Sequence, residues 1–217
     1  MTPSLLQLTF HGLGEPPAGT PAEEARRWVD PERAAAIMGL LSARSDVALT
    51  FDDGFASDID VALPLLRRHR LRASFFVVAG QIGTPGHIDA DGVRQLRAEG
   101  MEVGSHGMQH RSWCGLDDAG LREELVLARR SIEETLGTQV RAAACPFGRY
   151  NRRVLRALRR AGYERVLTSD GGRSDPLAWL QPRNTVLCEH EPAQVAGWNG
   201  AEGGRLAPVK RALKRLR

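Results

Sequence analysis

The sequence predicts a single α/β domain, folded as a distorted, incomplete (β/α) barrel of about seven parallel strands. Short apolar segments alternate with helical segments along most of the chain, and no repeat or shift in composition marks a second domain. Strands that alternate with helices pair in parallel through right-handed crossovers. At 217 residues the chain is long enough for one such domain with a substantial core.

The predicted elements follow one another in a regular order. A strand at 5–10 leads into a Gly/Pro-rich loop at 12–21, and a helix then begins at Pro31, capped by Asp30, and runs to about residue 43. Further strands are expected at 47–51, 73–78, 101–104, 140–145 and 165–168, and further helices at 58–70, 90–99, 116–136 and 152–161. Gly137 and Gly162 end the last two helices. We expect residues 1–191 to form the domain and residues 192–217 to form a flexible, basic tail.

The positive charge of the chain comes almost wholly from arginine. Basic residues number 30 against 26 acidic ones, and Lys210 and Lys214 are the only lysines. The arginines are spread over several predicted helices without an interleaved aromatic stripe, which favours solvated helix faces over a nucleic-acid surface. At 205–217 apolar residues alternate with basic ones, a pattern that fits either peripheral contact with an anionic membrane or a frayed, soluble tail.

The cysteines and the first residues favour a reducing compartment. Cys114, Cys145 and Cys188 are odd in number and widely spaced, and they form neither a zinc-ribbon pattern nor a disulfide framework. The first residues lack the basic start and apolar run of a secretory signal, and no segment approaches the ~20 apolar residues of a membrane helix. We therefore expect a cytoplasmic protein, either free or peripheral at the inner membrane face. The sequence predicts no oligomeric state.

Two short motifs carry candidate chemistry. Asp52 and Asp53 directly follow the strand at 47–51, and His106 and His110 follow the strand at 101–104. The carboxyl ends of parallel strands meet at one face of a barrel, so these side chains should lie together. Two imidazoles and one carboxylate make a three-ligand metal site with an open position for water, and the other carboxylate is free to accept a proton from that water. Zinc is the default ion for such donors, and cobalt, nickel or manganese would also fit.

With these motifs the chain resembles the polysaccharide deacetylases of the NodB-homology type, carbohydrate esterase family 4, over residues 5–185. The family motif Thr-Phe-Asp-Asp-Gly is intact at 50–54, and the resemblance implies that Asp52 is the general base and Asp53 a metal ligand. The second motif, usually His-Ser/Thr-x-x-His, keeps both ligand histidines. It has Gly107 in place of the hydroxyl residue, which predicts weaker support for this loop.

The third motif resembles the branch of the family that acts on exopolysaccharides such as poly-N-acetylglucosamine. Pro146-Phe147-Gly148 is followed by Tyr150-Asn151, and the resemblance makes the backbone N–H of Phe147 an oxyanion donor. The arginine usual in this motif is missing. Arg183, which resembles a Pro-Arg pair of related chains, is expected to orient Asp52 instead, and Asp170 could pair with Arg183.

The general acid has two candidates. In the exopolysaccharide branch the barrel is circularly permuted, and the acid comes from a Tyr-His motif near the N-terminus. Phe10-His11 stands at the corresponding place, which implies that His11 is the acid. Other members use a late Leu-His motif, which His190 matches more poorly.

These residues predict a metal-dependent hydrolase that removes N-acetyl groups from an amino-sugar glycan, with Asp52 as base and a metal-bound water as nucleophile. Two alternatives stay open. The enzyme could remove an acetyl or formyl group from a lipid-linked sugar at the inner membrane face, or the chain could be a non-catalytic carbohydrate-binding relic of the same fold.

Overall fold

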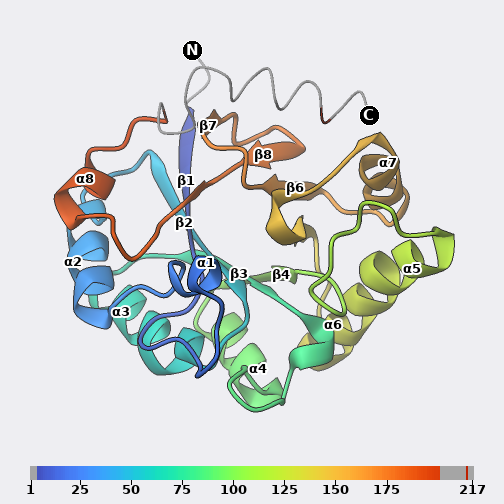
Figure 1. Ribbon diagram of the computed structural model, residues 1–217, viewed down its shortest axis with the longest axis horizontal. Coiled ribbons are helices and arrows are strands. Elements are labelled where there is room, and N and C mark those ends of the chain that lie inside the picture. The colour runs from blue at the N-terminus through green and yellow to red at the C-terminus, as the bar shows by residue number, and fades with distance from the viewer. Residues whose placement is uncertain (1–3, 201–213, 215–217) are drawn as a thin grey trace.

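Seven strands run parallel in chain order around the molecule: β1, β2, β3, β4, β5, β6 and β8. Helices form a ring outside them (Figure 1), and the short β7 adds an antiparallel strand to β1. This computed structural model describes residues 4–200 and 214. The predicted α/β barrel is confirmed.

The elements have the following bounds. The strands are β1 (Leu5–Phe10), β2 (Val47–Asp53), β3 (Ala73–Val77), β4 (Glu102–Ser105), β5 (Ala142–Ala144), β6 (Arg165–Thr168), β7 (Arg173–Ser174), β8 (Leu180–Pro182) and β9 (Asn184–Thr185). The α-helices are α1 (Ala22–Ala25), α2 (Pro31–Leu41), α3 (Leu63–Arg68), α4 (Ala90–Ala98), α5 (Asp118–Arg122), α6 (Ala128–Leu136), α7 (Arg152–Arg160) and α8 (Pro192–Ala196). Two π-helical turns, η1 (Asp58–Ala62) and η3 (Glu123–Leu127), and two 3₁₀ turns, η2 (Ala79–Gln81) and η4 (Pro146–Gly148), complete the set.

One segment near the end of the chain closes the gap between the two sides of the barrel. Its first part, β8, pairs with β6, and its second part, β9, pairs with β1. Arg183 is the single residue between the two parts. Its side chain is fully buried, so the closure places a guanidinium inside the barrel.

The two faces of the strands have different roles. Phe10, Phe51 and Phe75 are paired across β1, β2 and β3, and their buried rings stack at 5.4 Å and 4.8 Å. Side chains alternate along a strand, so Thr50 and Asp52 point to the opposite face from Phe51. This second face is polar. Its hydrogen bonds to Arg183 show that it is the interior of the barrel.

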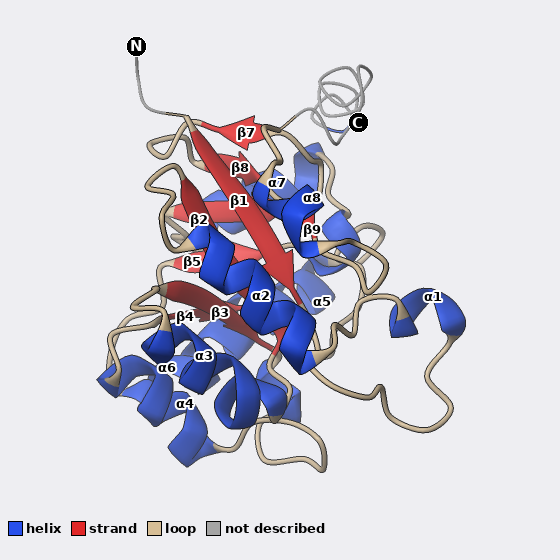
Figure 2. Cartoon of the chain, turned by 90° about the vertical axis from the view of Figure 1, so that its left-hand side faces the viewer, coloured by secondary structure: helices blue, strands red, loops and turns tan. Residues whose placement is uncertain are grey.

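The sequence misses details of the helices. The short α1 was not expected, and it buries no side chain and stands apart from the sheet (Figure 2). The helix expected at 116–136 begins at α5, two residues later, because Asp117 caps it, and a π-helical turn divides it before α6. The predicted end at Gly137 is confirmed, with φ 68°. None of the described helices has the length and apolarity that crossing a bilayer requires.

The fold extends past residue 191, where the tail was expected to begin. Helix α8 packs against α2, and Val195 and Trp198 are buried. The predicted boundary is therefore too early, because the sequence of α8 is too short to show a helical period. The rest of the expected tail, apart from Lys214, lies outside the described residues.

Candidate active site

Three neighbouring strands end at the same level and bring the two motifs together. Asp53 at the end of β2 pairs with Val77 of β3, and Val77 pairs with Ser105 of β4. His106 follows directly after Ser105. Asp52 and Asp53 are the last residues of β2 rather than the first residues after it, because the strand is two residues longer than predicted.

Asp53, His106 and His110 form a cluster of three potential metal ligands. One donor atom from each lies within 4.8 Å of the others. Nε2 of His106 and Nε2 of His110 are 3.4 Å and 3.2 Å from Oδ1 of Asp53. That oxygen is enclosed and has no hydrogen-bond partner in the described part of the chain. Such convergence of lone pairs on an unsatisfied carboxylate fits a divalent cation.

The protonation states of the two histidines suit the same function. Burial lowers the pKa of His106 to about 3 and also lowers the pKa of His110, so both imidazoles are neutral at pH 7. Nδ1 of His106 lies 2.9 Å from the carbonyl oxygen of Ala144. Since a carbonyl only accepts, Nδ1 carries the proton and Nε2 presents its lone pair to the cluster. Burial, with the nearby charge of Asp52, raises the pKa of Asp53 to about 8.

Backbone strain is concentrated at this site. Four non-glycine residues in the described part of the chain have positive φ, and three of them are Asp53 (78°), His110 (48°) and Phe147 (58°). The left-handed region costs such residues of order 1–3 kcal/mol each. The surrounding fold therefore holds these three side chains in place against a local preference.

Asp52 forms a bidentate ion pair with Arg183 inside the barrel. Nη1 and Nη2 of Arg183 each donate a hydrogen bond of 2.6 Å to a different carboxylate oxygen of Asp52. Burial alone would raise the pKa of Asp52, but the charge of Arg183 and the hydrogen bonds that it donates outweigh burial and hold this pKa well below its usual range. Nε2 of His106 is 4.0 Å from Oδ2 of Asp52. The structure thus places an ionised carboxylate, held at both oxygens by Arg183, beside the three potential ligands.

The two histidines considered as acids lie in different surroundings. His11 is one residue past the Phe10–Phe51 pair and so is level with Asp52 on the next strand. Its Nδ1 is enclosed without a partner in the described chain, and burial lowers its pKa to about 4. His190 instead accepts a hydrogen bond from the backbone N–H of Leu187 and packs edge-on against Trp198. Its geometry is that of a structural residue.

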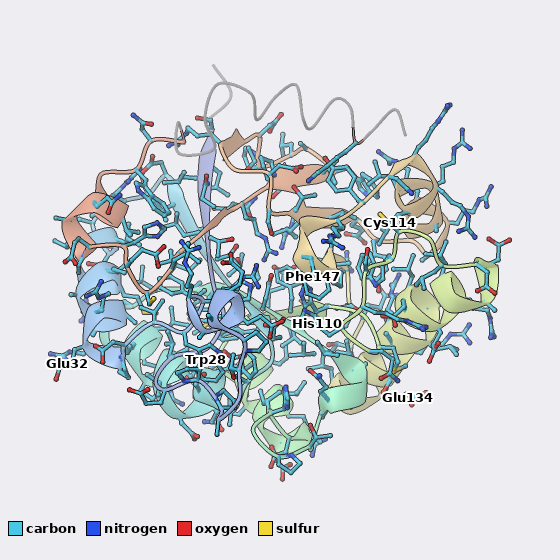
Figure 3. All side chains as sticks on the ribbon, in the orientation of Figure 1. Trp28, Glu32, His110, Cys114, Glu134 and Phe147 are labelled. Carbon is cyan, nitrogen blue, oxygen red and sulfur yellow. The ribbon has the colours of Figure 1, made fainter. Side chains whose placement is uncertain are left out.

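Phe147 lies against one of the potential ligands. Its ring centroid is 4.7 Å from that of His110, and its side chain is 45% exposed. Figure 3 shows the labelled His110 and Phe147 next to each other near the centre of the view. The third motif is therefore at the rim of the same site.

Asp170 does not take the partner that the sequence predicted. Its Oδ2 accepts hydrogen bonds from Tyr150 (2.7 Å) and Thr168 (2.9 Å), and Oδ1 accepts one from Lys214 (2.6 Å). The guanidinium of Arg183 is directed to Asp52 instead, so the predicted pair is wrong. The sequence could not decide between the two carboxylates because it does not fix the direction of a side chain between β8 and β9.

Sequence reasoning missed Glu124. This fully buried carboxylate accepts hydrogen bonds from the backbone N–H of Met108 (2.8 Å), Nε of Arg111 (2.7 Å) and Nε1 of Trp113 (3.3 Å). These donors surround the loop that carries His110. The expectation of weak support at Gly107 is therefore wrong, since a carboxylate from η3 supports the loop.

One sequence feature could have identified Glu124. It lies among Leu121, Leu125, Ala128 and Ile132, which form the buried stripe of this helix. A carboxylate on an apolar stripe needs strong partners.

The comparisons with known proteins concern the family and the fold of the chain. A family model described as polysaccharide deacetylase matches residues 42–166. The chitooligosaccharide deacetylase of Bradyrhizobium sp. (strain ANU 289) is 32% identical over 148 residues, which cover 66% of this chain and 63% of that protein. The peptidoglycan-N-acetylglucosamine deacetylase of Bacillus cereus is 28% identical over 145 residues, which cover 66% of this chain and 65% of that protein. The chain thus spans less than two thirds of the length of these relatives.

A solved structure shares the architecture. The Streptococcus pyogenes deacetylase PplD, in complex with acetate, superposes with a TM-score of 0.79 over 90% of this chain and 97% of that one, at 20% identity. At this identity the likeness shows the fold.

Proposed function

Because the chain belongs to the polysaccharide deacetylase family, we propose that it is a metal-dependent hydrolase that removes N-acetyl groups from an amino-sugar glycan. One observation carries the proposal. Three convergent potential ligands, Asp53, His106 and His110, lie beside Asp52, which Arg183 holds ionised. This set offers both a place for a cation and a base next to it.

The potential ligands define what a cation would add. A divalent ion held by Asp53, His106 and His110 would supply Lewis-acid activation of water and of the amide carbonyl. Zinc suits two imidazoles and one carboxylate, and cobalt, nickel and manganese accept similar donors.

Asp52 acts as the general base in this proposal. It accepts the proton of the attacking water, since Arg183 keeps it ionised and fixes both of its oxygens. The backbone N–H of Phe147 donates a hydrogen bond to the oxyanion that forms on the substrate.

His11 protonates the leaving amine nitrogen. Its pKa of about 4 makes it neutral at pH 7, so it must first receive a proton. Asp52 is close enough for its charge to raise the pKa of His11, and Asp52 is the group that has just gained a proton. A transfer from the base to the acid during the reaction therefore fits the arrangement.

The expected substrate is an exopolysaccharide of the poly-N-acetylglucosamine type. Support comes from Phe10-His11 at the end of β1 and from the motif at 146–151. The named relatives are deacetylases of chitooligosaccharides and of peptidoglycan N-acetylglucosamine. A non-catalytic carbohydrate-binding relic would have no need for an ionised base beside the potential ligands.

The metal content of purified protein is the first test. Elemental mass spectrometry should find about one zinc-like ion per wild-type chain, little in His106→Ala, and an unchanged amount in the control His190→Ala. Absence of metal from the wild type, even after reconstitution, would overturn the metal-dependent mechanism.

Turnover is the second test. Acetate release from oligomers of N-acetylglucosamine should fall by about 10²- to 10⁴-fold in Asp52→Asn, which keeps its metal, and in His11→Ala. His190→Ala should stay near the wild-type rate. Equal losses in His11→Ala and His190→Ala would contradict the assignment of the acid. Release of formate from a lipid-linked sugar, without acetate from free oligomers, would identify the alternative substrate.

A further inference from the structure

Three arginines on α7 form one basic row on the outside of the barrel. Arg152, Arg156 and Arg159 follow one another at spacings of four and three residues, which places them on one face of the helix. All three are exposed, and none forms an ion pair or hydrogen bond with another residue in the described part of the chain. Arg159 stacks over the ring of Trp179 at 4.0 Å.

The row borders a groove with an apolar floor. The groove has a volume of about 460 Å³, and Leu155, Trp179 and Leu180 line it together with the three arginines. Leu177, in the connection between β7 and β8, is 85% exposed and precedes Trp179 by two residues. The exposed carboxylate on this connection, Asp175, accepts the backbone N–H of Leu177. We call these three arginines, the groove and Leu177 the α7 surface.

We propose that the α7 surface docks on an anionic phospholipid membrane. Guanidinium groups bind phosphate through paired hydrogen bonds. No described residue holds the N–H groups of these three arginines, and the stacking of Arg159 on Trp179 leaves its N–H groups free to donate. Nε1 of Trp179 donates a hydrogen bond to the carbonyl oxygen of Tyr163 (2.7 Å), so the indole contributes apolar surface to the groove rather than a free donor. An exposed leucine beside it can enter the acyl region. Together these features match lipid headgroups and the apolar layer below them.

A soluble polyanion explains these features less well. Such a polymer would use Arg152, Arg156 and Arg159 but would leave the apolar groove and Leu177 without a partner. The net charge of +4 favours an anionic membrane and a soluble polyanion alike, so it does not distinguish between them. The combination of apolar and basic groups on one surface therefore selects the membrane.

The docking site is independent of the deacetylase chemistry. Helix α7 begins five residues after Phe147, and none of the residues that line the groove belongs to the candidate active site. Binding can be measured without any turnover. A failure of the membrane proposal thus leaves the proposed hydrolase function untouched, and the reverse also holds.

Vesicle flotation with the full chain tests the proposal. Wild-type protein should bind vesicles containing phosphatidylserine and should not bind vesicles of phosphatidylcholine alone. Each arginine near an anionic surface contributes roughly a fivefold gain in affinity. The triple variant R152Q/R156Q/R159Q should therefore bind about a hundredfold more weakly. Leu177→Ser should lose roughly tenfold.

A matched control separates this surface from general electrostatics. The variant R68Q/R97Q/R130Q removes the same charge from exposed arginines of α3, α4 and α6. It should keep most of the affinity, and circular dichroism melts should show that both triple variants fold. Equal losses in the two triple variants, or no binding by the wild type, would overturn the proposal. Binding of heparin that depends on the α7 arginines, without binding to vesicles, would also overturn it and identify a soluble polyanion.

Discussion

A Cβ atom added to Gly107 would lie 2.4 Å from Oε2 of Glu124. The carboxylate thus occupies the space that a side chain at position 107 would need. The same oxygen accepts the backbone N–H of Met108 and lies 3.3 Å from Nε1 of Trp113. Glu124 therefore occupies the space that a hydroxyl side chain at position 107 would take. It can do so only because residue 107 is a glycine.

Gly107→Ser should lower the stability of the fold, although it restores the residue type that is common in the family motif. Gly107 has φ +90°, which a serine adopts only with strain, and the new side chain would collide with Glu124. We expect a loss of about 2–4 kcal/mol in the free energy of unfolding. Urea denaturation of the metal-free protein measures it. A serine variant as stable as the wild type would show that the loop can move away from Glu124.

Glu124→Ala should lower metal affinity, because the loop that carries His110 loses its support. Residues that hold a ligand loop typically change affinity by 10- to 100-fold. Competition with a chromogenic chelator measures the dissociation constant of zinc for each variant.

Glu123→Ala is the matched control for this substitution. Glu123 is adjacent and half-exposed, and it also pairs with Arg111 (2.6 Å), but it accepts no hydrogen bond from the loop backbone in the described part of the chain. The zinc affinity of Glu123→Ala should stay within twofold of the wild-type value, a change too small to reflect the loss of loop support. Equal effects of the two variants would mean that Arg111, rather than the loop contacts of Glu124, matters for the metal.

Arg183→Met should shift the pH profile of the reaction. Without the guanidinium, burial raises the pKa of Asp52, so the base becomes protonated at a higher pH and the acid limb of kcat/KM moves upward. At neutral pH we expect a loss of about 10²- to 10⁴-fold. Arg183→Lys should recover part of it, since a lysine restores charge but not the bidentate geometry.

The pair Arg44–Asp46 provides a control for charge removal. Arg44 also contacts both oxygens of an aspartate, at 3.0 Å and 2.8 Å, outside the site. Arg44→Met should leave the acid limb where it is in the wild type. A profile of Arg183→Met that falls uniformly, without a shift of its acid limb, would contradict the electrostatic role of Arg183.

The sequence predicts those parts of the site that depend on topology. Asp53 and His106 come together because parallel strands in chain order end at the same level, and the alternation of strands and helices contains that information. The parts that depend on side-chain direction are not predictable in this way. From the sequence, Asp170 is a possible partner of Arg183. In the structure it accepts hydrogen bonds from Tyr150 and Thr168 instead.

Buried charge is the other limit of sequence reasoning. The apolar stripe indicates that Glu124 is buried, but the donors that compensate its charge come from the loop at 108–113, and only the tertiary fold brings them to it. Asp58 is a similar case. Its place at the start of a predicted helix suggests an exposed residue, but the structure buries it completely.

Asp58→Asn should stabilise the protein at neutral and alkaline pH. Both carboxyl oxygens of Asp58 are enclosed without a hydrogen-bond partner among the described residues. Burial, followed by the charges of Asp53 and Asp52, raises the pKa of Asp58 well above its ordinary value. The folded protein therefore keeps a proton that the unfolded chain releases above about pH 4, so Asp58 costs stability as the pH rises. Asparagine has the same shape and cannot ionise, so the stability advantage of the variant should grow with pH, by at most about 1.4 kcal/mol per pH unit.

Urea denaturation of metal-free protein at pH 4, 6 and 8 measures this difference between Asp58→Asn and the wild type. The control Asp60→Asn, at an exposed position on the same turn, should show no such difference. A constant difference between Asp58→Asn and the wild type across this range would mean that Asp58 is ionised in the folded protein and has a partner that compensates its charge.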